Sequence, residues 1–464
     1  MLVVAALALT VSAEPRHSAR VWQTQSSGGG LHETHPIVAS SCEAYEAATV
    51  DLDAARPSHP YLGIGGGFAE ASCKLIMSLP EGRRAELLRM LFAKDGANLN
   101  IGRLHVGASD YSTKVYTLDD GVADPELKRF SIDPDREWIL PAVKAALQVR
   151  PDLFLFSSPW SPPAWMKTNG SLYGGWMRTK WLPVFADYYV AWLKAYCAEG
   201  IPVAALTIQN EPECERSGSP TCLWHPDQEA EVAGRLLPPR LRAAGLSTKI
   251  WIWDHNFDRW QRPLNQLKDP DVRTNVDAVA FHPYCGRPEA LDRFRAACPG
   301  VTVHQTEIGP SASWGTGGSS LACWGERVLK CLNHGCSSFV NWCLVLDEKG
   351  YPNTSVGLDC YGLVSVETKS GAIIPSAQYE VFCHIGRFVD RGSTVLDSFV
   401  ERPVFENGGD HLIATAFRNA DGSHAVVVLC DQPENGHSQF QVKYRGEWYQ
   451  VSLPGTSVST ILFR

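Results

Sequence analysis

The feature that most constrains the fold is a regular alternation of β-prone runs and amphipathic stretches through the middle of the chain. Eight runs rich in branched and aromatic residues lie between residues 61 and 345, and helix-like stretches separate them. Two of these stretches end in a glycine, Gly200 and Gly245, as helix C-termini commonly do. This pattern predicts a parallel (β/α)8 barrel, or TIM barrel. The expected strands are residues 61–68, 98–107, 152–158, 202–210, 249–254, 276–282, 301–306 and 337–345.

A doubly wound parallel sheet is the alternative for such an alternation. Its nucleotide-binding form needs a G-x-G-x-x-G turn after the first strand. The sequence GIGGGF instead places Phe68 at the third glycine position, and the chain contains no G-K-[ST] phosphate loop. The barrel is therefore favoured, and no cofactor is expected.

The two ends of the chain have a different pattern. From residue 391 to 464, strand-like runs follow one another at short spacing, divided by turn sequences such as NADGS and PENG. Such a succession is typical of a β-sandwich. Residues 14–58 contain further strand-like runs, and we expect these to join the same module. The predicted architecture is thus a barrel over residues 59–390 with a side β-sandwich built from both chain ends.

The first thirteen residues, MLVVAALALTVSA, form an apolar run that ends in small residues. The run is too short to cross a bilayer, and its length and small-residue end are those of a signal-peptide core, although a basic n-region is missing. We therefore expect a signal peptide over residues 1–13, export to a secreted or lumenal compartment, and no stable membrane insertion. Fourteen cysteines fit an exported chain, and a disulfide between Cys214 and Cys222 could close a short loop.

Charge and cysteine spacing argue against other partners. The chain has 42 Lys and Arg against 50 Asp and Glu, a net charge of −8, which gives no reason to expect a nucleic-acid partner. CLNHGC, from Cys331 to Cys336, has some likeness to a metal site, but no second cluster at ligand spacing accompanies it. Core or disulfide cysteines are therefore favoured over zinc, and no metal is expected.

Polar or aromatic residues follow every expected barrel strand. Loops after the carboxyl ends of barrel strands form the working face of this fold, so these residues are candidates for chemistry. Glu211 follows the fourth strand and Glu307 the seventh. Two carboxyl groups about 5 Å apart suit a retaining glycoside hydrolase, and a wider gap an inverting one. The other tip residues are Glu70, Arg103, His105, Trp160, Ser161, Asn210, Asp254, His255, Asn256, His282, Tyr284, Asn341 and Trp342.

Each of these residues also has a structural interpretation. A glutamate at a strand end can cap the next helix or pair with an arginine. Arg103 can serve only to neutralise acids inside the barrel, and Trp160 can be a buried rim residue. His282 can be a structural histidine with both nitrogens satisfied.

Three long motifs at these positions resemble glycoside hydrolase family 30. They are SPWSPPAWMKTNGSLYGG at residues 158–175, LTIQNEPE at 206–213 and IWDHNFDRW at 252–260; GGFAEASC and GRLHVGASDYS fit as well. The resemblance runs from about residue 61 to 389. It implies a (β/α)8 barrel with a side β-sandwich, in a family that contains glucosylceramidases and β-1,6-glucanases.

Carried over to this sequence, the resemblance implies a role for each motif residue. Glu211 is the expected acid/base and Glu307 the expected nucleophile, and Asn210 is expected to bond the sugar 2-hydroxyl. The acid role predicts that burial or the charge of Glu307 raises the pKa of Glu211. The residues expected to line the subsite for the non-reducing sugar are Arg103, Asp110, Trp160, His282, Tyr284 and Trp342.

The expected function is that of a retaining β-glycosidase acting on a carbohydrate or glycolipid, with a glucosylceramidase-type β-glucosidase placed first. An endo-β-1,6-glucanase of the same family is the alternative, and a non-catalytic carbohydrate-binding protein is the alternative from another class. Three departures from the family pattern concern the leaving-group side. Pro283 stands where glucosylceramidases commonly have a tryptophan, Ile308 and Gly309 replace a small residue and a cysteine, and NTSVGLDCYGLVSVET lacks an apolar run.

Overall fold

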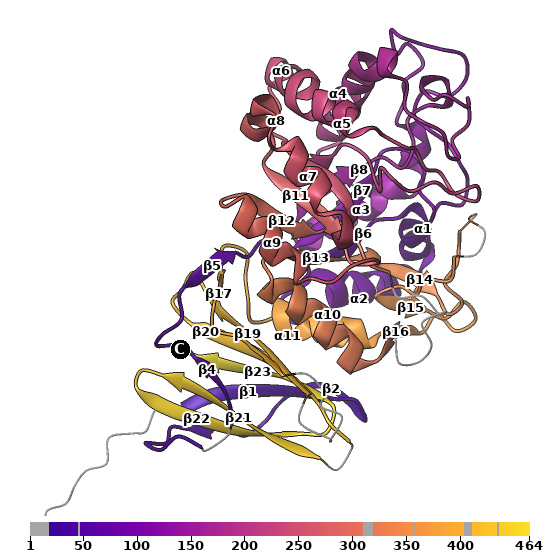
Figure 1. The fold of residues 1–464 in the computed structure, drawn as a ribbon. Coiled ribbons are helices and arrows are strands. Elements are labelled where there is room, and N and C mark those ends of the chain that lie inside the picture. The colour runs from indigo at the N-terminus through magenta and orange to yellow at the C-terminus, as the bar shows by residue number, and fades with distance from the viewer. Residues whose placement is uncertain are drawn as a thin grey trace, which may run out of the picture.

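The structure of the protein is a computed structural model, and it describes residues 18–44, 47–309, 319–353, 355, 358–402, 411–433 and 436–464. Residues 1–13, interpreted above as a signal peptide, lie outside the described residues. Figure 1 shows a barrel surrounded by helices and, beside it, a smaller β-sandwich that contains strands from both ends of the chain.

All eight expected barrel strands are confirmed and form one parallel sheet in the order β12-β11-β10-β9-β8-β7-β6-β13. Backbone hydrogen bonds join its two ends: the Ser337 N–H donates to the Val303 carbonyl at 2.7 Å, and the Ile308 N–H to the Val340 carbonyl at 3.1 Å. The strands are β6 (Gly63–Gly67), β7 (Ile101–His105), β8 (Phe154–Ser158), β9 (Ala205–Thr207), β10 (Lys249–Asn256), β11 (Ala278–His282), β12 (Thr302–Gln305) and β13 (Ser338–Cys343).

The glycine run of β6 has a steric cause. A Cβ atom on Gly65 would lie 1.9 Å from the Ile101 carbonyl oxygen, and one on Gly67 would lie 2.1 Å from that of Trp342. Neighbouring strands on both sides therefore approach β6 more closely than a side chain permits. GIGGG is a packing feature of the barrel and not part of a phosphate loop.

Helices cover the outside of the barrel. The amphipathic stretch at residues 227–245 is not one regular helix, because a π-helical turn over Val232–Leu236 separates two short helices. Pro238 and Pro239 follow this turn and lack the N–H groups of a regular helix, which accounts for the change in hydrogen-bond register. The helices are α1 (Glu70–Ser78), α2 (Glu81–Phe92), α3 (Ile139–Val149), α4 (Leu182–Ala198), α5 (Pro226–Glu231), α6 (Leu237–Ala243), α7 (Gln261–Gln266), α8 (Pro270–Asn275), α9 (Ala290–Ala297), α10 (Leu321–Asn333) and α11 (Ala377–Gly386).

The β-sandwich takes strands from both chain ends, as predicted. Its larger sheet has nine strands, in the order β2-β1-β23-β20-β19-β17-β5, with β3 on β1 and β18 on β19; its smaller sheet is β22-β21-β4. The strands are β1 (Ser18–Gln25), β2 (Gly28–Glu33), β3 (Ile37–Val38), β4 (Ala48–Asp51), β5 (Pro57–Pro60), β17 (Thr394–Leu396), β18 (Val400–Arg402), β19 (His411–Arg418), β20 (His424–Asp431), β21 (His437–Tyr444), β22 (Glu447–Pro454) and β23 (Ser457–Phe463). A separate three-stranded sheet of β14 (Val345–Asp347), β15 (Val364–Val366) and β16 (Ile373–Pro375) follows the barrel.

A continuous layer of buried apolar side chains joins barrel and sandwich, and the two sheets of the sandwich enclose a second core of their own. Helices α10 and α11 pack on the larger sheet, and Leu429 and Val458 of that sheet belong to the same buried cluster as the side chains between the barrel strands and the surrounding helices. The fully buried His384 of α11 places one ring nitrogen 3.0 Å from Thr460 Oγ1 and the other 3.0 Å from Thr24 Oγ1. The sandwich therefore packs firmly against the helices of the barrel.

All fourteen cysteines have free thiols. The disulfide considered between Cys214 and Cys222 is not formed, because Cys214 lines a pocket while the Cys222 side chain is fully buried and lies 3.6 Å from the Leu223 carbonyl oxygen. In the described part of the chain, we find no helix with the length and apolar character needed to span a membrane.

Candidate active site

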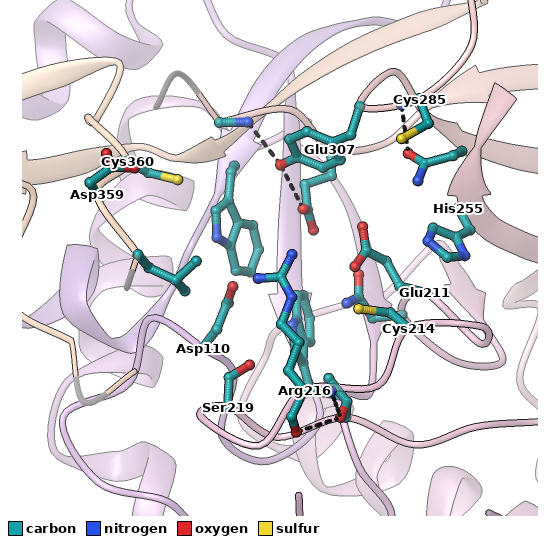
Figure 2. Close-up of a pocket in the computed structure, with 18 residues that line it drawn as sticks. Asp110, Glu211, Cys214, Arg216, Ser219, His255, Cys285, Glu307, Asp359 and Cys360 are labelled. Carbon is teal, nitrogen blue, oxygen red and sulfur yellow. Dashed lines mark hydrogen bonds between the residues drawn. The ribbon is translucent and has the colours of Figure 1, made fainter. Parts of the chain in front are cut away.

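A pocket of about 390 Å³ lies at the carboxyl ends of the barrel strands. Glu211 and Glu307 both line it, and in Figure 2 their side chains point into it from two different strand ends. Arg103 and His282 are fully buried and contact these carboxylates from below. The structure brings together all nine predicted site residues: Arg103, Asp110, Trp160, Asn210, Glu211, His282, Tyr284, Glu307 and Trp342.

The two candidate acids face each other at short range. One carboxylate oxygen of Glu211 and one of Glu307 lie within 4.8 Å of each other. His282 lies between them, with Nδ1 at 3.0 Å from Glu211 Oε1 and 3.8 Å from Glu307 Oε1. This separation leaves no room for a water molecule behind a sugar ring and is the spacing of a retaining pair.

The backbone departs from regular strand geometry after β9 and within β10, where Glu211 and Asp254 stand. Glu211 has a left-handed conformation with φ of 47°, and its N–H donates to the Asp254 carbonyl at 3.1 Å. On the neighbouring strand, Trp253 and Asp254 have φ values of 79° and 50° at a β-bulge. Such conformations are costly for residues other than glycine and concentrate at functional sites. A strand thus leads into Asn210 and Glu211 because the chain turns sharply there, toward the pocket.

Arg103 neutralises the acids from within the barrel. Its guanidinium donates to a carboxylate oxygen of Glu307, to Asp254 Oδ2 at 2.7 Å and to Asn210 Oδ1 at 2.8 Å. Burial acts to lower the pKa of Arg103, but the two carboxylates outweigh it, so that this pKa is raised and the charge is permanent. The charge lies 4.8 Å from the ring centre of Trp160.

Asp254 is a site residue that the sequence analysis left among the uncommitted strand tips. It is fully buried, and its carboxylate accepts hydrogen bonds from Arg103, Ser158, Thr207 and Thr306 at 2.6 to 2.8 Å. Burial acts to raise the pKa of Asp254, but the Arg103 and His282 charges and these bonds hold it well below its usual range. Asp254 therefore supplies the fixed negative charge beneath the pocket.

The pKa of Glu211 differs from the prediction. His282 Nε2 lies 3.0 Å from Asp254 Oδ1; burial acts to lower the pKa of His282, but Glu307 and Asp254 raise it to about 9. Burial likewise acts to raise the pKa of Glu211, but the His282 bond and nearby positive charges lower it to about 2. The expected rise in the pKa of Glu211 is therefore wrong, because the hydrogen bond to His282 and the nearby positive charges outweigh burial.

Tyr284 positions Glu307. Its hydroxyl donates to Glu307 Oε1 at 2.8 Å and accepts the Gly309 N–H at 3.0 Å. Burial and the charge of Glu307 raise the pKa of Tyr284 far above its usual value, so the phenol keeps its proton. Glu307 is therefore held on one side by Arg103 and on the other by Tyr284, which fixes the orientation of its carboxylate.

One wall of the pocket offers aromatic faces and an unsatisfied carboxyl group. The rings of Trp160 and Trp342 stack with their centres 4.8 Å apart and planes at 21°. Asp110 Oδ1 is buried without a hydrogen-bond partner among the described residues, and burial together with the charge of Glu307 raises the pKa of Asp110 to about 8. Such a wall suits the apolar face and the hydroxyls of a sugar.

Sequence reasoning assigned no site residue in two pocket segments, because both are loops without periodic signal; the second lies within NTSVGLDCYGLVSVET, which was noted only as a departure on the leaving-group side. The loop after Glu211 contributes Cys214, Arg216, Ser219 and Thr221, and the segment 358–360 contributes Leu358, Asp359 and Cys360. Their only sequence signal is proximity to a strand tip, which many solvent-exposed loop residues share.

Two groups of side chains have the spacing of metal ligands within the described residues: Glu211 with His282 and Glu307, and Glu289 with His334 and Glu401. In the first, both ring nitrogens of His282 already lie 3.0 Å from carboxylate oxygens. In the second, His334 lies 2.8 Å from Asp292, and the Lys330 ammonium lies 3.9 Å from Glu289. Imidazolium and ammonium groups thus balance the acids at both places.

A (β/α)8 barrel whose strand ends present two facing carboxylates beside stacked aromatic rings is the arrangement of a retaining glycoside hydrolase. Sequence comparison makes the assignment specific. Residues 61–388 match the family model described as the glycosyl hydrolase family 30 TIM-barrel domain, and residues 398–461 match the glycosyl hydrolase family 30 beta sandwich domain. The chain belongs to glycoside hydrolase family 30.

Individual relatives agree with this assignment along most of the chain. A Neurospora crassa protein named endo-1,6-beta-D-glucanase is 30% identical over 394 residues, which are 82% of this chain and 80% of that protein. The lysosomal acid glucosylceramidase of Mus musculus is 26% identical over 426 residues, 87% of this chain and 81% of that protein. A solved endo-β1,6-glucanase superposes with a TM-score of 0.86 at 26% identity, covering 96% of this chain and 99% of that structure.

Proposed function

We propose that the protein hydrolyses β-1,6-glucan with retention of configuration, with Glu211 as acid/base and Glu307 as nucleophile. The observation that carries the proposal is the separation of at most 4.8 Å between their carboxylate oxygens across the pocket. Glu307 suits attack because hydrogen bonds from Arg103 and Tyr284 hold its carboxylate oriented toward the pocket. Glu211 suits proton transfer because a protonated His282 lies 3.0 Å from it.

In the first half-reaction, Glu307 forms a bond to the anomeric carbon while the bond from that carbon to the leaving-group oxygen breaks. Glu211 delivers a proton to that oxygen and draws on the proton that it shares with His282. In the second, Glu211 takes a proton from water, the water oxygen bonds to the anomeric carbon, and Glu307 leaves as a carboxylate. Two inversions give net retention.

Glucose fits the wall described above. Trp160 and Trp342 offer faces for the ring, Asp110 has an unpaired oxygen for a hydroxyl, and Asn210 is placed beside Glu211 to bond the 2-hydroxyl. The Asn210 amide oxygen is held by Arg103, so its NH₂ group is left to donate toward the substrate.

The leaving group is assigned as a glucan for two reasons. Two relatives named as endo-1,6-β-glucanases are 30% identical to this chain, and the glucosylceramidases among the relatives are 24% to 26% identical. The pocket wall away from the tryptophans is polar: among its described side chains are Arg216, Ser219, Thr221, His255, Asn256 and Asp359, with Leu358 as the aliphatic one. The many hydroxyl groups of a glucan find partners on such a wall, and the hydrocarbon chains of a ceramide do not.

A substrate panel tests this assignment. We expect wild-type protein to release oligosaccharides from β-1,6-glucan, with the β-anomer formed first in the NMR spectrum, and to act far more slowly on β-1,3-glucan and on glucosylceramide in detergent. Preference for glucosylceramide would favour the second candidate, a glucosylceramidase, to which the relatives at 24% to 26% identity point. Sugar binding without turnover would overturn both.

We further propose that residues 1–13 direct export of the protein. The support is their apolar run with its small-residue end. Expression in a eukaryotic host with N-terminal sequencing of the medium fraction tests it, and the expected first residue is Glu14. Retention of the intact chain inside the cell would contradict export.

A further inference from the structure

The loop between β9 and α5 forms one wall of the pocket and is firmly held. The Lys167 ammonium donates to the Thr221 carbonyl at 2.6 Å, and the Gly175 N–H donates to Glu215 Oε1 at 2.9 Å. Within the loop, the Arg216 N–H donates to Thr221 Oγ1 at 3.2 Å. The backbone that carries Arg216 is therefore anchored to the neighbouring loop and to itself.

The side chain of Arg216 points from this wall into the pocket, toward the space between Asp110 and Glu211 (Figure 2). Burial acts to lower the pKa of Arg216, but the adjacent Cys214 and the carboxylates of Glu211 and Asp110 outweigh it and raise this pKa. Among the described residues, Arg216 forms hydrogen bonds with oxygen through its backbone N–H and carbonyl, both with Thr221 Oγ1, and its guanidinium has no oxygen partner. Arg103 has its donors taken by buried oxygen acceptors, whereas Arg216 faces the Cys214 thiol and keeps most of its donors for a ligand.

The position of Arg216 relative to the two acids indicates which part of a substrate it meets. Glu307 approaches the anomeric carbon from one side, and Glu211 protonates the leaving-group oxygen on the other. Arg216 shares the loop of Glu211 and lines the pocket with it, close enough for the charge of Glu211 to raise its pKa. Because it comes from the loop of the acid/base and not from the glucose side of the wall, its guanidinium can reach the leaving-group side of the bond to be broken. A planar fork of N–H donors matches neighbouring oxygen atoms on such a group.

We propose that Arg216 is a specificity residue for the leaving group, donating hydrogen bonds to the hydroxyl oxygens of a leaving-group sugar. A hydrocarbon leaving group would cover the guanidinium without offering it acceptors, and the protein therefore discriminates against it. The inference rests on the proposed function in one respect, namely that the leaving group is a carbohydrate.

The test compares leaving groups on a common glucose. We expect Arg216→Met to lower kcat/KM for a β-1,6-gluco-oligosaccharide by about 10- to 100-fold, and to change kcat/KM for octyl β-glucoside by less than about 3-fold. Arg216→Lys keeps the charge without the fork and should recover part of the loss. Arg259→Met is the matched control, because that side chain is 68% exposed and does not line the pocket.

Folding is checked with a reaction that has no sugar leaving group. Labelling of Glu307 by 2,4-dinitrophenyl 2-deoxy-2-fluoro-β-glucoside should proceed at the wild-type rate in Arg216→Met. An equal loss on the oligosaccharide and octyl substrates would overturn the proposal, since Arg216 would then act on the glucose or on Glu211. An unchanged oligosaccharide rate would overturn it as well. If wild-type protein prefers another sugar linkage, the proposed function fails, while the sugar-to-octyl ratio still tests Arg216.

Discussion

Asp254 lies beneath both candidate acids without touching the pocket, so its effect on them is transmitted by Arg103 and His282. Replacing this carboxylate by an amide leaves Arg103 with one buried ionic partner in place of two. Residues that hold a catalytic group in its charge state are as necessary as the group itself, although they contact no substrate.

We expect Asp254→Asn to lower the free energy of unfolding by about 3 kcal/mol or more, because one partner of a buried charge network is removed. The same change should reduce kcat/KM, since His282 loses a charge that favours its protonated form. Urea unfolding and initial rates measure the two effects. Asp258→Asn, at an exposed carboxylate four positions along, is the control and should alter neither.

The shared proton predicts an alkaline limit to activity. The pKa of His282 is raised to about 9, so the imidazolium is present below that pH and is lost above it. In His282→Gln, Glu211 must hold the proton alone, and the alkaline limb of kcat/KM should move down by more than about one pH unit. Initial rates across the pH range on both sides of this pKa measure it. With a 2,4-dinitrophenyl leaving group, which needs no proton, the alkaline limb of kcat/KM should be missing in both proteins. An alkaline limb at the same pH in His282→Gln and in wild type, with the natural leaving group, would contradict the role of His282.

Azide distinguishes the two acids. Glu211→Ala with a dinitrophenyl β-glucoside and azide should yield β-glucosyl azide, because the anion attacks the covalent intermediate on Glu307. Glu307→Ala should yield α-glucosyl azide, because azide replaces the missing nucleophile. NMR of the products decides, and exchanged anomers would reverse the assignment.

Two adjacent strands, β9 and β10, depart from regular geometry at the point where the site needs it. Each has a left-handed residue near or just beyond its carboxyl end, Glu211 and Asp254, and a backbone hydrogen bond joins these two residues. The departures are costly on their own and are held by the surrounding sheet. In contrast, β6 keeps regular strand geometry, and its glycines allow the backbones of β7 and β13 to approach it closely.

Gly65 of β6 should tolerate no side chain. We expect Gly65→Ala to lower the free energy of unfolding by about 1–3 kcal/mol or more, since its Cβ would lie 1.9 Å from a backbone carbonyl oxygen. Thermal unfolding measures the change. Gly82→Ala is the matched control: it lies in α2 with no atom within 4 Å of the added Cβ, and should stabilise the helix by up to about 1 kcal/mol. Equal effects of the two would contradict the steric argument.

For the molecule as a whole, the buried layer that joins barrel and sandwich predicts that the two unfold together. Leu429 of β20 packs against Gly325 of α10, where an added Cβ would lie 3.0 Å from its side chain. Leu429→Ala should lower the free energy of unfolding by about 2–5 kcal/mol. The temperature at which activity is lost and the midpoint of the calorimetric transition should decrease by the same amount. Loss of sandwich structure at a temperature where full activity remains would show two independent units.

The barrel strands were predictable because each is a β-prone run bounded by helical pattern, and the acids because polar residues interrupt apolar strands at Glu211 and Glu307. The side β-sandwich was predictable from short strand spacing. These features depend on local sequence.

The remaining features depend on contacts between distant residues. The low pKa of Glu211 follows from His282, two strands away along the sheet, and the role of Asp254 from side chains on or beside other strands. Arg216 lies in a loop without periodicity, and the three-stranded sheet of β14, β15 and β16 has strands of three residues each. No local pattern carries this information.

The pairing of β1 with β23 has a consequence for biosynthesis. The two strands are neighbours in the larger sheet, yet Gln25 of β1 pairs with Ser457 of β23. At a translation rate of about 5–20 residues per second, roughly 20 to 90 s pass between the synthesis of β1 and the synthesis of β23. During that interval a nascent strand with unpaired backbone groups is available to other polypeptides, so successful production of this enzyme depends on shielding its first strand until the last one emerges.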